Sequence, residues 1–298
     1  MAGSITTKTT RAYDVEDKRG WMMHLAQEGF VVIKDVITQE TADETKEMVR
    51  REMCEVSEEW DWNDTGTWVA QNSPMNWNQG GLEYRGFGQS DSMWKMRLES
   101  RAHEIFGMYY KTDDLVTSFE GWKMFVTNNQ VPLRVMRNQS PPERDVICGM
   151  INVMACGEND AGFVCVPGSH MFEGDIDIEK MKWEQNKVVT PERSMILYHS
   201  TLIHGMEGIS GEHTEGKHMN SLSAGVTFAP ANKQTSRALA ERMRAYHMGK
   251  SSTYRCDIFE EKKAEGLTRA VYTKRSLRDL EVKVTEEGQI PEERLQVI

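Results

Sequence analysis

Two stretches of the chain decide its fold. Residues 162–170 read Gly-Phe-Val-Cys-Val-Pro-Gly-Ser-His, and residues 197–205 read Leu-Tyr-His-Ser-Thr-Leu-Ile-His-Gly. The first is a short apolar run of strand type that ends in a turn, where Gly168 supplies a permissive backbone. Further runs of strand type recur between residues 122 and 230, at 146–154, 194–198 and 222–228. Several short strands at this spacing predict a jelly-roll-type double sheet rather than a parallel α/β sheet.

Helical patterns flank these strands, so the predicted fold class is mainly β with flanking helices. The predicted helices are 16–28, closed by Gly29, 39–59, capped by Thr38, 92–110 and 233–249, with a charged helical insertion over 175–186. A short strand is predicted over residues 30–33. We expect a flexible N-terminal arm over residues 1–13, a single domain over 14–250, and a charged C-terminal extension over 251–298, packed on the domain or extending from it.

The composition excludes several classes of function. The formal net charge of −10 argues against a nucleic-acid or anionic-membrane partner. Five cysteines without CxxC spacing argue against a disulfide framework or a zinc knot. The polar first twenty residues show no signal peptide, and no apolar run approaches the roughly 18 residues of a membrane span. We therefore expect a soluble, cytoplasmic protein.

The order of these motifs resembles the phytanoyl-CoA dioxygenase-like family. The resemblance rests on the Pro-Gly-Ser-His turn, on the His204 segment, and on the opening pattern of helix, Gly-Phe-Val-Val-Ile and helix around residues 29–33. It covers roughly residues 16 to 230. It implies a double-stranded β-helix, a jelly-roll or cupin-like barrel, of the iron(II)/2-oxoglutarate oxygenases. It also implies that His204 occupies the distal iron-ligand position, with His170 and His199 as supporting residues.

The other two iron-ligand positions have changed. In the family these positions read approximately His-x-Asp-Gln, whereas residues 136–139 here read Met-Arg-Asn-Gln. The resemblance therefore places Met136 and Asn138 where the ligands would be. A thioether is a poor ligand for iron(II), and an amide oxygen is weaker than a carboxylate. His199 could replace a ligand, but it lies five residues before His204, and odd spacing on a strand points the two side chains to opposite faces.

The position that pairs with 2-oxoglutarate has changed as well. The family places an arginine there, past the distal histidine, because a guanidinium binds a carboxylate through two parallel hydrogen bonds. This chain has no arginine between Arg193 and Arg237. The matching region offers Lys217, Asn220 and Ser221.

These substitutions favour a catalytically inactive member of the fold that binds no cofactor. Such a protein would act as a binding, scaffold or structural module. A protein partner would bind through the aromatic segment 60–92 and the C-terminal tail, and a small molecule could enter the barrel. One alternative is an active iron(II)/2-oxoglutarate-dependent hydroxylase of a small molecule, with unusual ligands. Another is a metal-free isomerase or cyclase with His204 and Lys217 as acid–base groups.

Overall fold

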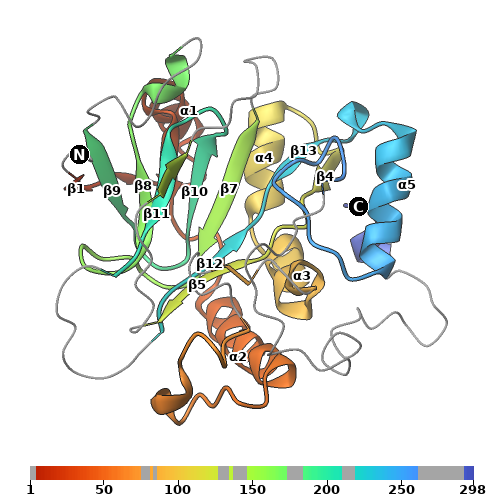
Figure 1. Cartoon of the computed structure of the whole chain (residues 1–298). Helices are drawn as coiled ribbons and strands as arrows, with labels where there is room; N and C mark the ends of the chain where they lie inside the picture. Colours follow the sequence, from red (N-terminus) through yellow and green to blue (C-terminus); the bar gives the residue numbers. More distant parts are fainter. Residues whose placement is uncertain are drawn as a thin grey trace.

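Two facing β-sheets and a set of helices beside them make up the described part of the chain (Figure 1). The structure is a computed structural model, and it describes residues 5–74, 81–82, 86–126, 134–136, 146–172, 184–209, 219–260 and 292–298. No helix in these ranges is both long enough and apolar enough to cross a bilayer.

The larger sheet has six strands in the order β2-β3-β10-β7-β12-β5. They are β2 (Ala12–Tyr13), β3 (Phe30–Ile33), β5 (Trp122–Val126), β7 (Ile147–Asn152), β10 (Ser194–His199) and β12 (Met219–Gly225). The smaller sheet has five strands in the order β1-β9-β8-β11-β6. They are β1 (Ile5–Thr9), β6 (Arg134–Met136), β8 (Gly162–Cys165), β9 (Gln185–Val189) and β11 (His204–Glu207). Strands β4 (Leu115–Thr117) and β13 (Phe228–Pro230) pair separately.

The path of the chain through these sheets is consistent with a jelly roll. Between β5 and β12 the chain crosses from one sheet to the other at every connection except that from β8 to β9. Such crossing between two sheets is how a jelly roll is wound. The prediction of a mostly β double sheet with flanking helices is therefore confirmed. Hydrogen bonds between the described strands do not join the two sheets into one closed barrel.

The helices begin and end close to the predicted capping residues. They are α1 (Lys18–Glu28), α2 (Gln39–Val56), α3 (Asp91–Glu99), α4 (Ala102–Tyr110), α5 (Ser236–His247) and α7 (Glu292–Leu295), with single 3-10 turns at Thr65–Thr67, Phe87–Gln89, Ser169–Met171 and Ala231–Lys233. The Thr38 hydroxyl accepts the backbone N–H of Thr41 at the start of α2. Gly29 ends α1 in the left-handed conformation, with φ at 79°, and its N–H donates to the Leu25 carbonyl.

Three local predictions are corrected. The helix expected over residues 92–110 is broken, because Ser100 is extended and its hydroxyl accepts the Ala102 N–H at the start of α4. Residues 5–9 and 12–13 are strands, whereas an arm was expected, since β1 pairs in parallel with β9, and β2 with β3. Most of the insertion expected over residues 175–186 lies outside the described residues, but its last two residues begin strand β9 and are not helical.

Two apolar cores hold the layers together. The inner core lies between the two sheets and contains Phe30, Val32, Met150, Phe163, Cys165, Val188, Ile196 and Leu202. The larger, outer core uses the opposite face of the six-stranded sheet, for example Ile151 and Leu197, and packs it against helical residues such as Trp94 and Phe106. Figure 1 shows α3, α4 and α5 gathered on that side. The site predicted from the sequence belongs to the inner core.

Candidate functional site

His204 begins strand β11 inside the smaller sheet. The strand register sets it opposite Met136 of β6 on one side and opposite Cys165 of β8 on the other. Its ring lies 4.8 Å from the Tyr198 ring and is stacked at 5.7 Å on Phe163. The inward direction follows from strand alternation, because Met206, two residues further along β11, lines the inner pocket.

A main-chain carbonyl two residues earlier holds the imidazole of His204 in one orientation. Nδ1 lies 2.8 Å from the Leu202 carbonyl oxygen, and only a protonated Nδ1 can donate to that acceptor. The neutral ring then carries its free lone pair on Nε2. Burial lowers the pKa of His204, and the hydrogen bond to Leu202 opposes this effect. The ring is therefore a neutral base with a fixed tautomer at physiological pH.

Some of the predicted site residues lie close together in the structure, and others lie outside the described residues. Met136 is the direct cross-strand neighbour of His204. Asn220 and Ser221 lie near the start of β12, and Ser221 lines the inner pocket. Asn138 and Lys217 lie outside the described residues.

His199 and His170 lie side by side at one end of β10. Their rings stack at 4.6 Å, and the Nε2 of His170 lies 3.1 Å from the Ala26 carbonyl oxygen. His199 ends β10 whereas His204 begins the next strand, β11, so the expectation that spacing along one strand separates their side chains is wrong. The backbone N–H of His199 donates to the Gly29 carbonyl at 2.9 Å.

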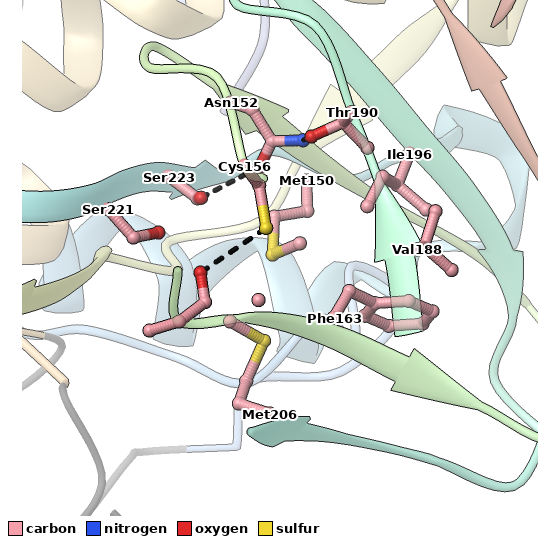
Figure 2. Close-up of a pocket in the computed structure, with 12 residues that line it drawn as sticks. Met150, Asn152, Cys156, Phe163, Val188, Thr190, Ile196, Met206, Ser221 and Ser223 are labelled. Atoms are coloured by element: carbon pink, nitrogen blue, oxygen red, sulfur yellow. Dashed lines mark hydrogen bonds between the residues drawn. The ribbon is translucent and has the colours of Figure 1, made fainter. Parts of the chain in front are cut away.

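A narrow pocket occupies the space between the two sheets (Figure 2). Its apolar walls include Met150, Phe163, Val188, Ile196 and Met206, and its polar residues are Asn152, Cys156, Thr190, Ser221 and Ser223. The empty space is about 180 Å³, including the part open to solvent, below the roughly 300–1,000 Å³ of typical ligand pockets. The side chains of its own walls thus fill most of the interior.

Hydrogen bonds within the pocket satisfy its polar end. The Asn152 amide donates to the Thr190 hydroxyl at 3.0 Å and accepts from the Ser223 hydroxyl at 2.8 Å, as Figure 2 shows. The Cys156 thiol donates to the Ala161 carbonyl at 3.4 Å. Asn152 and Thr190 are not among the predicted site residues, although a lone asparagine in the apolar run 146–154 signals a buried polar group that needs partners.

The described residues do not fit an iron and 2-oxoglutarate site. Non-haem iron of this class is held by two histidines and one carboxylate. Within the described ranges no group of three His, Cys, Asp or Glu side chains could hold a metal ion. The pocket lining also contains no Lys or Arg that could pair with a dicarboxylate. The buried Lys187 side chain lies next to Gly162. Its amine is 3.3 Å from the Glu207 carboxylate and donates to the Asp160 carbonyl, so its charge is paired within the chain.

Comparisons with known proteins support the fold. No model of a protein family matches the chain. Ava biosynthesis cluster protein O of Aspergillus versicolor is 25% identical over 170 residues, which are 55% of this chain and 54% of that protein. The matched stretch thus spans about half the length of this relative.

Two solved structures share the fold at low sequence identity. EvdMO1 aligns with a TM-score of 0.51 and 15% identity, over 72% of this chain and 50% of its own. AviO1 from Streptomyces viridochromogenes Tue57 aligns with a TM-score of 0.51 and 14% identity, over 72% of this chain and 96% of its own. SnoN, a non-heme alpha ketoglutarate dependent epimerase from nogalamycin biosynthesis, gives a TM-score of 0.49 at 12% identity, over 72% and 85% of the chains. That last likeness is too distant to bear on the function of this chain.

Proposed function

We propose that this chain is a non-catalytic jelly-roll module that carries out no iron and 2-oxoglutarate chemistry. The observation that carries the proposal is the strand register of His204 with Met136, because the resemblance assigns an imidazole ligand to position 136 and the residue there is a methionine. The filled pocket supports it, because the Asn152 amide there already pairs with the Thr190 and Ser223 hydroxyls. The name of the Aspergillus versicolor relative supports a role in a biosynthetic pathway.

The module would act by binding another protein. We place the partner surface on the segment around Trp60, Trp62 and Trp68, within the aromatic stretch 60–92. Trp60 and Trp68 stack with ring centres 5.6 Å apart, and Trp62 lies edge-on to both. Trp62 is half-buried and carries the Arg50 guanidinium 5.5 Å from its ring centre. A rigid tryptophan with an arginine beside it is typical of a binding hot spot.

The test is the binding of iron(II) and 2-oxoglutarate to anaerobic protein, measured by calorimetry with a metal assay alongside. The proposal expects no binding of 2-oxoglutarate at any iron concentration, and the same traces for the wild type and His204→Ala. Tight binding in which each ligand strengthens the other, and which His204→Ala abolishes, would overturn the proposal. The chain would then be an oxygenase whose remaining ligands come from residues outside those described.

A further inference from the structure

Residues 292–298 return to the body of the protein after a stretch that the structure does not describe. The single helical turn α7 packs against α3, on the helical side of the six-stranded sheet. Of the side chains described in this segment, those of Val297 and Ile298 are only 8% and 3% exposed. An isolated helix of four residues is unstable in water, so this segment owes its structure to docking.

The backbone of the segment completes hydrogen bonds of two other elements. The Thr117 N–H of strand β4 donates to the Val297 carbonyl at 2.8 Å. The Nε of Arg242, on helix α5, donates to the Ile298 oxygen at 2.8 Å. A buried donor that loses its acceptor is costly, so β4 and α5 both depend on this segment.

Arg294 fastens the segment to helix α3. Its guanidinium donates to the Asp91 carboxylate at 2.8 Å and lies 5.2 Å from the Trp94 ring centre. A second nitrogen lies 3.4 Å from the Tyr246 hydroxyl of α5. One side chain therefore bridges α3 and α5 through an ion pair, a cation–π contact and a hydrogen bond to a neutral hydroxyl.

The surface that the segment covers contains two more buried arginines. Arg97 and Arg242 are 1% and 0% exposed, and both lie against the Phe119 ring, at 5.9 Å and 4.4 Å. Their bound oxygens belong to the main chain: Arg97 donates to Glu120, and Arg242 to Thr117 and Ile298. Arg97 Nε and Nη1 and Arg242 Nη1 have no hydrogen-bond partner among the described residues, so burial of these cations costs free energy and water would hydrate them if the segment moved away.

We propose that residues 292–298 form a latch that closes the arginine–aromatic layer between α3, α5 and β4. Val297 and Ile298 belong to the outer core and not to the inner core between the two sheets, so opening the latch exposes apolar residues on the helical side and leaves the inner core intact. When it is closed, Arg294, Val297 and Ile298 face inward, and only the exposed residues of α7 remain available to a partner. This inference does not rest on the proposed function.

Hydrogen exchange of the full-length chain tests the latch. The variants are Arg294→Gln and Val297→Asp, with Arg237→Gln as the matched control. Arg237 pairs with Glu241 at 2.9 Å on α5, but its side chain is 87% exposed. Loss of a charge-assisted bond should speed exchange over residues 115–118 and 292–298 by about tenfold or more. Strands β7 and β10 should keep wild-type rates in both variants, and the control should match the wild type throughout.

Two results would overturn the latch. Wild-type exchange over residues 115–118 in Arg294→Gln would show that this side chain does not hold the segment down. If hydrogen exchange in β7 and β10 became faster by the same factor as over residues 115–118, the segment would open only when the whole domain unfolds. Should Val297→Asp fail to fold, Arg294→Gln still decides between these outcomes, because it changes one polar side chain and removes no apolar residue from the core.

Discussion

His204 and Met136 lie directly opposite each other on the adjacent antiparallel strands β11 and β6. Opposed residues in such a pair have Cα atoms roughly 4.5–5.5 Å apart. The cross-strand neighbour of His204 is therefore a methionine, whose thioether is a poor ligand for iron(II). The proposal that the chain binds no iron rests on this residue identity.

Restoring the missing donors should therefore create a metal site. We expect the double variant Met136→His, Asn138→Asp to bind cobalt(II) with a visible absorption band, while the wild type shows none. A histidine and an aspartate two residues apart on a strand project to the same side. Titration with cobalt under anaerobic conditions measures the effect.

The matched control is the same double variant with His204→Ala added. It should lose most of the gained affinity, because a site with two protein donors is far weaker than one with three. Cobalt binding by the wild type as tight as by the double variant would contradict the prediction. It would place the metal on residues outside the β6–β11 pair.

The three tryptophans near residue 60 should differ sharply in their contribution to stability. Trp60 is 2% exposed, so Trp60→Ala should cost about 3–5 kcal/mol of unfolding free energy. Trp62 is half-buried and donates to the Arg50 carbonyl at 3.0 Å, so Trp62→Ala should cost only about 1–2 kcal/mol. Urea unfolding measures both values.

A conservative change refines this prediction. The Trp60 Nε1 is buried without a hydrogen-bond partner among the described residues, so Trp60→Phe removes an unsatisfied donor and should cost clearly less than Trp60→Ala. Equal losses for Trp60→Ala and Trp62→Ala would mean that the cluster is not packed as described. The segment would then be a poor candidate for a rigid partner surface.

The parts of the fold that local chemistry controls were predictable from the sequence. Thr38 caps α2 and Gly29 ends α1 as expected, because each acts on backbone groups within four residues. Strand β1 was not predictable. Its residues are threonines and a lysine next to an isoleucine, and its partner, β9, lies about 180 positions further along the chain. Pairing at that distance leaves no local pattern.

The candidate site, like the fold, was predictable from the sequence only in part. The sequence singled out His204 and Met136, and the strand register makes them neighbours, while their roles at a former metal site stay a prediction. It gave no sign that Asn152, Thr190 and Ser223 meet inside the sheets, because each comes from a different part of the chain and their contact depends on the jelly-roll path. The positions at Asn138 and Lys217 stay predictions.

A glycine in β7 should tolerate no side chain. A Cβ on Gly149 would meet the Val226 carbonyl oxygen and the end of Met195, and backbone cannot move aside as a flexible side chain can. Gly149→Ala should therefore cost about 1–3 kcal/mol or more of unfolding free energy. Gly157→Ala is the control, since its Cβ would lie 3.1 Å from one Asp160 oxygen only, and it should cost under about 1 kcal/mol. Similar losses for both variants would contradict the close approach of β7 to Val226.

Glu52 should make the stability of the protein depend on pH. Its carboxylate is buried between α2 and α3, where it accepts the Ser92 N–H at 2.9 Å and the Ser92 hydroxyl at 2.5 Å. Burial raises its pKa from an ordinary 4.5 to about 7, an effect that the bonds from Ser92 oppose and the nearby charge of Asp91 reinforces.

The sign of the pH effect follows from this raised pKa. Between about pH 4.5 and 7 the folded chain holds a proton that the unfolded chain has released, so stability falls as the pH rises through this window and levels off above it. The total loss is at most about 3 kcal/mol. Glu52→Gln should remove this slope in urea unfolding measured from about pH 5 to 8, whereas a change of the exposed Glu99 to Gln should leave it in place. A slope that survives in Glu52→Gln would mean that Glu52 is ionised in the folded protein across the whole range.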